Sequence, residues 1–368
     1  MVSSRVLKVL IIDDSAYNRR VIADFVEEIP DAIVVGKASD GQEGLQMALN
    51  ERPDVITLDL EMPRMDGFSF LRLLMSNQPT PVIVVSSHSD KENVFRALEL
   101  GALDFVAKPS HRATPEILEL KDEVIEKIRM AGQLKSNSLH RLKSYAPADL
   151  SASGGFPVID IDTDGGFEPG MEPLAQKVVV MAASTGGPAS IMQILSSLPG
   201  DLPISILVAQ HMPPMFITTF SERLNRQCAM RVTELTLVDM ARKGVIYICP
   251  GDKNLELTPG LSGTIITAVR PKSTDRYVPS ADYLFKSAAS ALRKNVMAVV
   301  LTGMGDDGAN GSVAVASVGG PVLVESVDTA VVGGMPQAVL RTGTPAMEEP
   351  LQNIAEKIVQ FAHSSDSG

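Results

Sequence analysis

Short apolar runs that end in polar or glycine-rich turns are the feature that most constrains the fold of this chain. In the first third they alternate with stretches of helical periodicity, and the five runs are Val6–Ile12, Ala32–Ala38, Val55–Leu58, Val82–Val85 and Phe105–Ala107. Strands that alternate with helices favour a parallel sheet with helices on both faces. The pattern therefore predicts an α/β fold with a five-stranded, doubly wound sheet, closed by a fifth helix at about Pro115–Met130.

The same pattern returns later in the chain, after a stretch that lacks it. From Gly132 to about Pro173 the hydrophobic period disappears, and Ser, Gly, Asp and Pro give a composition that cannot bury a core. Buried-strand runs resume at Lys177–Ala183, Ile204–Ala209, Gly244–Cys249, Val296–Leu301 and Pro321–Val324. We therefore expect a first domain over residues 1–130, a flexible linker over 131–175 and a second doubly wound α/β domain over 176–363.

Composition excludes several classes of protein. The chain has 368 residues and a formal net charge of -11, which argues against a nucleic-acid partner because such a partner needs a basic face. Two cysteines, Cys228 and Cys249, cannot form a disulfide framework. No apolar stretch is long enough to span a bilayer, and the N-terminus lacks the apolar core of a signal peptide. We expect a cytoplasmic monomer that does not insert into a membrane.

Three carboxylates follow strands of the first domain. Asp13 and Asp14 end the first strand, and Asp59 ends the third. Because the ends of parallel strands meet at one edge of the sheet, these side chains are expected to form one acidic pocket. Hard oxygen ligands of this kind suit Mg²⁺, and an aspartate can itself be the nucleophile in phosphoryl transfer.

Two further residues stand at the ends of neighbouring strands, and an aromatic residue lies in the fifth strand. Lys108 closes the fifth strand and offers an ammonium group, Ser86 ends the fourth strand and offers a hydroxyl, and Phe105 is an aromatic able to swing with that hydroxyl. A binding domain whose loops are acidic by chance is the alternative to a phosphorylation site. Perturbed charged groups gathered at one site favour the functional interpretation.

These residues resemble a two-component receiver domain. The resemblance covers about Val6–Met130 and includes the run Asp59-Leu60-Glu61-Met62-Pro63-Arg64-Met65-Asp66-Gly67. It implies a flavodoxin-like fold in which Asp59 accepts phosphate from a histidine kinase. It also implies that Asp14, Asp59 and the Glu61 carbonyl bind Mg²⁺, with Asp13 assisting through water.

The second domain supplies a serine, a histidine and an aspartate at its strand ends. Ser184 follows the run to Ala183, His211 follows the next run, and Asp306-Asp307 follow the run to Leu301. Of the five histidines, only His211 falls within the body of this domain, so a serine nucleophile here would need His211 as its base. Taken singly, Ser184 could be a helix N-cap and His211 a satisfied imidazole; the three together favour catalysis.

The second domain resembles the catalytic domain of the chemotaxis methylesterases of the CheB family. The agreeing blocks are Ala183–Gly187, Gln210–Pro214, Cys249–Asp252, Val278–Phe285, Thr302–Gly308 and Gly334–Pro336. The resemblance implies that Ser184 is the nucleophile, His211 the general base and acid, and Asp307 the orienting carboxylate, since the family motif places the aspartate directly before the glycine. It also implies that the Met304 backbone N–H, with Thr185, stabilises the oxyanion. No metal is implied in this half.

The two resemblances together imply a function. It is phosphorylation-activated hydrolysis of glutamate γ-methyl esters on chemoreceptors, with deamidation of receptor glutamines by the same residues. The unphosphorylated receiver is expected to cover the Ser184 mouth. Two residues depart from the family pattern, Ala182 in place of glycine and Asn254 in place of a frequent histidine. The alternatives are a non-catalytic docking module that drains phosphate, against which the intact triad argues, and a hydrolase of another ester in a pathway unrelated to motility.

Overall fold

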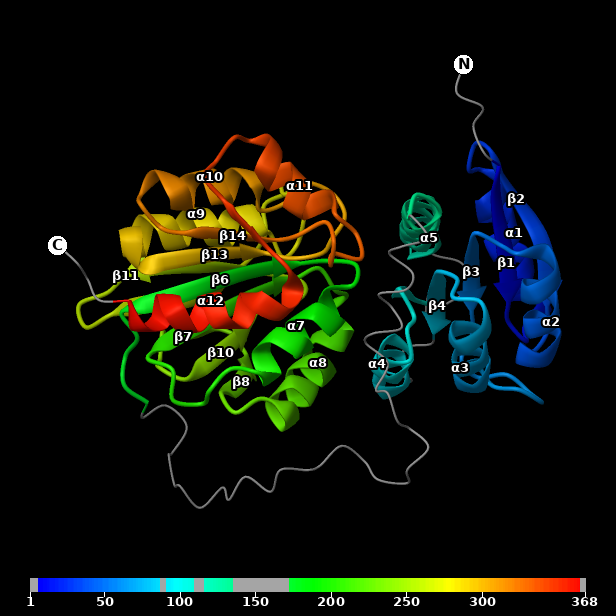
Figure 1. Cartoon of the computed structure of the whole chain (residues 1–368), viewed down its shortest axis with the longest axis horizontal. Coiled ribbons are helices and arrows are strands. Elements are labelled where there is room, and N and C mark those ends of the chain that lie inside the picture. The colour runs from blue at the N-terminus through cyan, green and yellow to red at the C-terminus, as the bar shows by residue number, and fades with distance from the viewer. Residues whose placement is uncertain (1–5, 87–90, 109–115, 135–171, 365–368) are drawn as a thin grey trace. The chain divides into compact units, whose positions relative to one another are not determined.

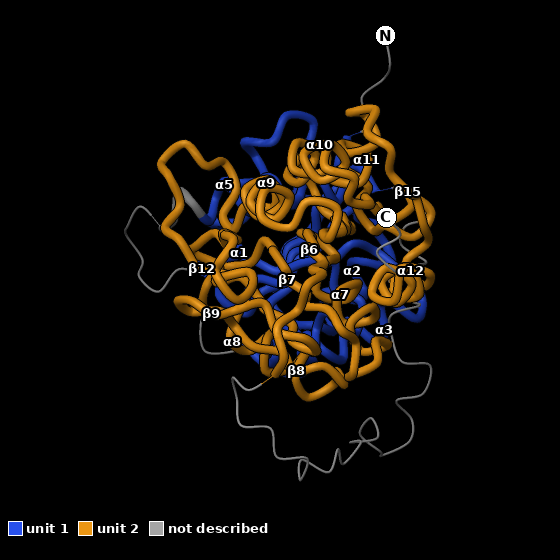
Figure 2. The backbone as a smooth tube through the Cα atoms, turned by 90° about the vertical axis from the view of Figure 1, so that its left-hand side faces the viewer, with its two compact units in different colours: residues 1–146 blue, residues 147–368 orange. Residues whose placement is uncertain are grey.

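The described part of the chain forms two compact units. The computed structural model describes residues 6–86, 91–108, 116–134 and 172–364. The two units are residues 1–146 and residues 147–368 (Figure 2). Most of the expected linker, residues 135–171, lies outside the described residues. Each unit has its own parallel sheet and its own buried core.

The first unit is a five-stranded parallel sheet with the strand order β2-β1-β3-β4-β5 (Figure 1). The strands are β1 (Leu7–Ile12), β2 (Ala32–Ala38), β3 (Val55–Leu58), β4 (Val82–Ser86) and β5 (Asp104–Ala107). The helices are α1 (Ala16–Glu27), α2 (Gly41–Glu51), α3 (Gly67–Asn77), α4 (Lys91–Glu99) and α5 (Glu116–Gly132). Helix α1 packs against α5 and α2 against α3, so the helices lie in two layers. The predicted class and the predicted five-stranded sheet are confirmed.

Local signals explain why these helices begin where they do. Ser15 accepts a hydrogen bond from the N–H of Asn18, and Asp40 and Asp66 cap α2 and α3 in the same way. Such caps satisfy N–H groups that the first turn of a helix leaves unpaired. Strands β3 and β4 are fully buried, as expected for the middle of a sheet covered on both faces.

The second unit is built on a seven-stranded parallel sheet with the order β15-β14-β13-β6-β7-β10-β8. Its strands are β6 (Lys177–Ala183), β7 (Ile204–Gln210), β8 (Arg231–Glu234), β10 (Val245–Ile248), β13 (Val296–Val300), β14 (Val322–Glu325) and β15 (Met347–Glu349). Its helices are α7 (Gly187–Ser196), α8 (Pro214–Gln227), α9 (Ala281–Leu292), α10 (Ala309–Ser317), α11 (Gly334–Arg341) and α12 (Leu351–His363). Helices α7, α8 and α12 pack together, as do α9, α10 and α11, and the two groups cover the sheet (Figure 1).

A three-stranded antiparallel sheet, β11-β12-β9, adds to this unit and was not among the expected strands. It consists of β9 (Val238–Met240), β11 (Asn254–Pro259) and β12 (Thr264–Val269), and α9 packs against β11. Residues assigned to the end of the linker also pack here: the Ala175 N–H donates to the Ala241 carbonyl at 2.8 Å. The ordered chain of this unit therefore includes residues 172–175.

The strand order places a switch point at β6. Strand β7 pairs with one side of β6 and β13 with the other. The connection after β6 runs to β7, and the connection after β13 runs to β14 in the opposite direction. Ligands of open α/β sheets bind at the carboxyl ends of strands at such a point. Across the helices described, none is long and apolar enough to cross a membrane.

Candidate functional site

The three carboxylates of the first unit meet around a lysine. Oxygen atoms of Asp13, Asp14 and Asp59 lie within 4.8 Å of one another, and Asp13 and Asp59 are 1% and 8% exposed. Lys108 Nζ lies 2.6 Å from Asp59 Oδ2 and 3.0 Å from Asp13 Oδ2. The side-chain amide of Asn18 donates to both oxygens of Asp13 at 3.2 Å. The sequence-predicted pocket is therefore assembled at the edge where β1, β3 and β5 end.

The charges in this cluster favour the binding of a cation. Burial raises the pKa of Asp59 and the nearby Asp13 charge adds to that, so the pKa of Asp59 stays above its ordinary value although Lys108 opposes the shift. Burial alone would lower the pKa of Lys108, but Asp59 and Asp13 outweigh it and raise that pKa. Three carboxylates face one ammonium group, and a hard divalent cation held by oxygen ligands would relieve the excess negative charge. The residues present fit Mg²⁺.

The remaining predicted receiver residues stand around this cluster. The backbone N–H of Glu61 bonds Asp59, while the Glu61 side chain is exposed. Ser86 Oγ is buried and has no hydrogen-bond partner in the described part of the chain. Phe105 is 2% exposed, with its ring edge-on to that of Phe95 at 6.4 Å between centroids. The described contacts thus join Lys108 to the carboxylates but do not join Ser86 or Phe105 to them.

Ser184 stands in the turn between β6 and α7. The N-cap of α7 is Gly186, with a φ of 78°, and no side chain caps this helix. The alternative that Ser184 serves as a helix N-cap is therefore wrong. The Ser184 N–H donates to the Thr302 carbonyl at 3.1 Å, which ties this turn to the loop after β13.

His211 is brought to Ser184 by strand register. Strands β6 and β7 pair Ala183 with Gln210, so Ser184 and His211 each follow a paired residue, and the His211 N–H donates to the Ala183 carbonyl at 3.0 Å. The buried Gln210 side chain donates from Nε2 to the carbonyls of both Ser184 and His211 at 3.0 Å. Gln210 thus fixes the two turns together, a role that its place at a strand end did not reveal.

Asp307 fixes the imidazole. Its Oδ2 lies 2.9 Å from His211 Nε2, and the carboxylate is 2% exposed. Four further donors hold it: the N–H groups of Ala281, Asp282 and Gly308 at 2.7, 2.9 and 3.1 Å, and the Ser280 hydroxyl at 3.3 Å. Burial alone would raise the pKa of Asp307, but the bond to His211 and the N–H groups at the start of α9 outweigh it and hold that pKa below its ordinary value. The carboxylate is therefore ionised at neutral pH. An N–H at His211 Nε2 that donates to this anion leaves Nδ1 as the ring nitrogen with a lone pair.

The loop after β13 also carries the residue expected to donate to the oxyanion. A Cβ built on Gly303 would lie 2.9 Å from Ser184 Cβ, so the backbone there runs against the serine and Met304 comes next. The Thr302 hydroxyl donates to the Thr185 carbonyl at 2.9 Å and accepts from the Val332 N–H at 2.9 Å. These bonds hold Thr185 and the Met304 segment close to Ser184; the oxyanion role itself stays a prediction.

Asn254, one of the two departures from the family pattern, begins β11 and contacts the residue that caps α9. Its side chain is 1% exposed, accepts from the Ser280 N–H at 2.7 Å and donates to Asp275 Oδ2 at 2.9 Å. Asn254 therefore supports the start of α9, where Asp307 is held. Ala182, the other departure, is fully buried in β6 and pairs with Val300.

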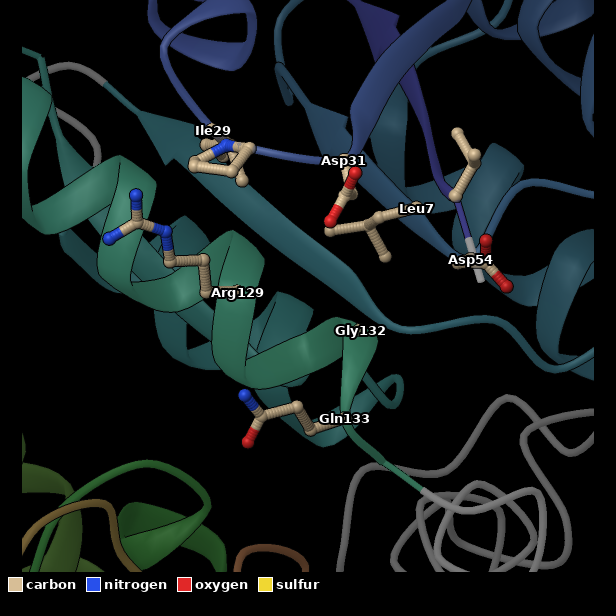
Figure 3. Close-up of a pocket in the computed structure, with 9 residues that line it drawn as sticks. Leu7, Ile29, Asp31, Asp54, Arg129, Gly132 and Gln133 are labelled. Atoms are coloured by element: carbon tan, nitrogen blue, oxygen red, sulfur yellow. The ribbon is translucent and has the colours of Figure 1, made fainter. Parts of the chain in front are cut away.

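Other candidate groups lie apart from the triad. Burial raises the pKa of the Cys228 thiol to about 12, which argues against a thiolate there. His363 ends α12 and is exposed. The first unit has a pocket of about 350 Å³. Its lining residues include Leu7, Asp31, Asp54 and Arg129 (Figure 3). None of these lining residues belongs to the acidic cluster or to the triad.

Comparison with known proteins agrees with both resemblances. Residues 179–358 match the family described as CheB methylesterase, and residues 9–118 match the response regulator receiver domain. A protein-glutamate methylesterase/protein-glutamine glutaminase of Geobacter sulfurreducens is 41% identical over 362 residues, 97% of each chain. One of Myxococcus xanthus is also 41% identical, over 98% of this chain and 99% of its own. The Thermotoga maritima CheB methylesterase catalytic domain covers 50% of this chain and 98% of its own, with 34% identity and a TM-score of 0.49.

Proposed function

The chain belongs to the family of CheB methylesterases that carry a receiver domain, and on that premise we propose how its two sites work. It is a protein-glutamate methylesterase, and its proposed substrates are γ-methyl esters on the cytoplasmic helices of chemoreceptors. Ser184, His211 and Asp307 form the proposed triad. The observation that carries the proposal is the 2.9 Å pair of His211 and the buried Asp307, beside the turn that holds Ser184.

Acylation begins with the serine hydroxyl. Ser184 Oγ attacks the ester carbonyl carbon while His211 Nδ1 takes the hydroxyl proton, and Asp307 stabilises the imidazolium that results. The tetrahedral intermediate then breaks its bond to the methoxy oxygen. His211 returns the proton to that oxygen, methanol leaves, and the glutamyl group stays on Ser184 as an ester.

Deacylation repeats the sequence with water. His211 takes a proton from water, the hydroxide attacks the acyl carbon, and the bond to Ser184 Oγ breaks as the proton returns to the serine. The product is a free glutamate carboxylate. In both halves the negative oxygen is stabilised by the Met304 N–H with Thr185, and each fixed donor contributes about 3 kcal/mol to transition-state stabilisation.

Deamidation of glutamine uses the same residues. The carbonyl that Ser184 attacks then belongs to an amide, and His211 protonates the leaving nitrogen so that ammonia departs. The relatives from Geobacter sulfurreducens and Myxococcus xanthus carry both activities in their names. We propose both for this chain.

The receiver half accepts phosphate at Asp59 from a histidine kinase. Asp13, Asp14, Asp59 and the Glu61 carbonyl are the residues proposed to hold Mg²⁺. When bound, Mg²⁺ supplies positive charge that offsets the negative charge of the phosphoryl oxygens. Lys108 offers its ammonium to the same oxygens. Ser86 and Phe105 are proposed to move when Asp59 carries phosphate.

Phosphorylation is proposed to regulate access to the serine. In the unphosphorylated chain the receiver would cover the Ser184 mouth, and phosphate at Asp59 would shift the population of domain arrangements towards an open one. Cleavage of the chain near Gly155 would then raise the basal rate. An unchanged rate after cleavage would exclude occlusion.

The proposed function is tested by methanol release from methylated chemoreceptor membranes. Release is measured with and without acetyl phosphate and Mg²⁺, for the wild type and for Ser184→Ala, Asp59→Ala and the exposed control Ser196→Ala. We expect phosphate-stimulated release that is lost in Ser184→Ala, unstimulated in Asp59→Ala and retained in the control. Release that survives Ser184→Ala would overturn the triad.

A further inference from the structure

The two adjacent aspartates after β13 serve different aromatic rings. Asp307 holds the edge of the His211 imidazole through Nε2. Asp306, which is 61% exposed at its side chain, accepts a hydrogen bond from the Tyr277 hydroxyl at 2.9 Å. Tyr277 lies on the segment before α9, 29 residues earlier in the chain. One loop therefore controls both the imidazole and a second ring.

Tyr277 covers one face of the imidazole. The rings of His211 and Tyr277 are parallel within 2°, and their centroids are 5.2 Å apart. This is an offset stack, the geometry that aromatic pairs prefer. The hydrogen bond to Asp307 fixes only one point on the edge of the imidazole, so the ring could still tilt about that point. A second ring on its face restricts the tilt.

Several contacts keep Tyr277 in this position. A Cβ built on Gly305 would lie 2.4 Å from the Tyr277 hydroxyl oxygen, and Gly305 has a φ of 88°, so a glycine there admits the phenol. The Arg276 guanidinium lies 4.9 Å from the centroid of the Tyr277 ring and 3.3 Å from Asp306 Oδ1. Burial, together with the hydrogen bond to Asp306, raises the pKa of Tyr277, so its hydroxyl remains a donor at neutral pH.

We propose that Tyr277, anchored by Asp306, is a positioning residue for His211. It holds the plane of the imidazole so that Nδ1 stays directed at the proton of Ser184 while Nε2 stays on Asp307. The inference rests on the proposed triad and deepens it. Because the productive geometry of a general base tolerates only small displacements, loss of the stack lowers the rate of the chemical step and leaves substrate binding almost unchanged.

The test compares kcat and KM for methanol release by the full chain, activated with acetyl phosphate and Mg²⁺. For Tyr277→Leu we expect kcat to fall about tenfold and KM to change less than about twofold. Tyr277→Phe keeps the ring and loses only the bond to Asp306, so its kcat should fall only about threefold. Tyr283→Leu is the matched control: its hydroxyl also bonds a carboxylate, that of Glu256 at 3.1 Å, and it should keep the wild-type kcat.

A second variant guards against misfolding of Tyr277→Leu. Asp306→Asn changes an exposed side chain, so the variant should fold like the wild type. It should lower kcat about threefold because the Tyr277 hydroxyl loses its charged acceptor. Combined with Tyr277→Leu it should add no further loss, since both changes act through the same ring.

The outcomes separate this inference from the proposed function. A wild-type kcat in Tyr277→Leu, or equal losses in the leucine and phenylalanine variants, would overturn the positioning role while Ser184-dependent release left the triad standing. A rise in KM with kcat unchanged would overturn it too, because it would make Tyr277 a substrate contact. Release that survives Ser184→Ala would overturn the triad and the positioning role together.

Discussion

Asp307 keeps its charge at a pH where an ordinary aspartate begins to lose it. Its five hydrogen-bonding partners include three backbone N–H groups, which an amide oxygen would serve less well than a carboxylate. We predict that Asp307→Asn lowers kcat for methanol release by about 10³-fold to 10⁴-fold, because the imidazole loses the anion that fixes its proton. Asp201→Asn, at an exposed turn, should keep the wild-type rate. A loss of less than tenfold would contradict the role of Asp307.

The same carboxylate links stability to pH. Its pKa is lower in the folded chain than the 3.8 of a free aspartate, so the ionised form stabilises the fold. That stabilisation is complete above the unfolded pKa and is lost as the pH falls through the folded one. At neutral pH the free energy of unfolding of the second unit should therefore be larger in the wild type than in Asp307→Asn. The difference should shrink below about pH 4. Denaturant titrations at several pH values measure it, and a constant difference would contradict the shift.

The ionisation of Asp59 affects stability in the opposite direction to that of Asp307. Its pKa is raised in the fold, mainly by burial, so the ionised carboxylate destabilises the receiver once the pH rises through the folded pKa. We predict that Asp59→Asn raises the thermal midpoint of the receiver at pH 7 without Mg²⁺, while Lys108 keeps its contact with Asp13 at 3.0 Å. Differential scanning calorimetry measures the midpoint. Asp24→Asn, an exposed change on α1, serves as the control and should not shift it.

The sequence predicted residues at strand ends better than the residues that support them. Ser184, His211 and Asp307 each follow a buried apolar run, so their positions could be inferred from the topology of a parallel sheet. Tyr277 and Asp306 are joined only by the folded loops, and nothing in their spacing indicates that one bonds the other. The one sequence feature that pointed to a further role was the pair Asp306-Asp307, because a triad needs only one of these two carboxylates.

At the scale of elements, the start of α9 organises the active site. Its first N–H groups bind Asp307, and Asn254 of β11 accepts from the Ser280 N–H just before it. We predict that Asn254→Ala destabilises the second unit by about 1–3 kcal/mol, since a buried N–H loses its acceptor. It should also lower kcat as α9 shifts. Thermal melts with Asn353→Ala of α12 as the matched control check this; an unchanged melt would show that Asn254 supports nothing.

The antiparallel strands show where element prediction fails. β11 buries Asn254, Leu255 and Leu257, while its last two residues are exposed. That pattern is weaker than the continuous apolar runs of β6 or β7, and β9 has only three residues. These strands are stabilised by pairing with one another and by α9, so their structure depends on contacts far apart in the sequence. The central parallel strands β6, β7, β10, β13 and β14 carried their own signal because both of their faces are buried. The parallel edge strands β8 and β15 are partly exposed and were not among the expected strands either.

At the scale of the whole molecule, the two units are expected to respond separately to a metal ion. We predict two unfolding transitions, of which MgCl₂ raises only the one that belongs to the receiver, because ligand binding stabilises the state that binds it. Asp14→Asn should remove most of that rise. Asp14 is exposed, so its loss costs the fold little, and Asp24→Asn is the control. A rise that persists in Asp14→Asn would exclude Asp14 as a ligand.

The residues of the proposed hydrolytic site all belong to the second unit, and this placement bears on how such chains arise. Within the described part of the chain, the contacts given above for Ser184, His211 and Asp307 join residues of the second unit, including the amide of Gln210 that joins the serine and histidine turns. Recombination that replaced the receiver with a different sensory module would therefore inherit the chemistry intact. If the proposed site is correct, an exchange of this kind would alter the input signal and leave the hydrolysed bond the same.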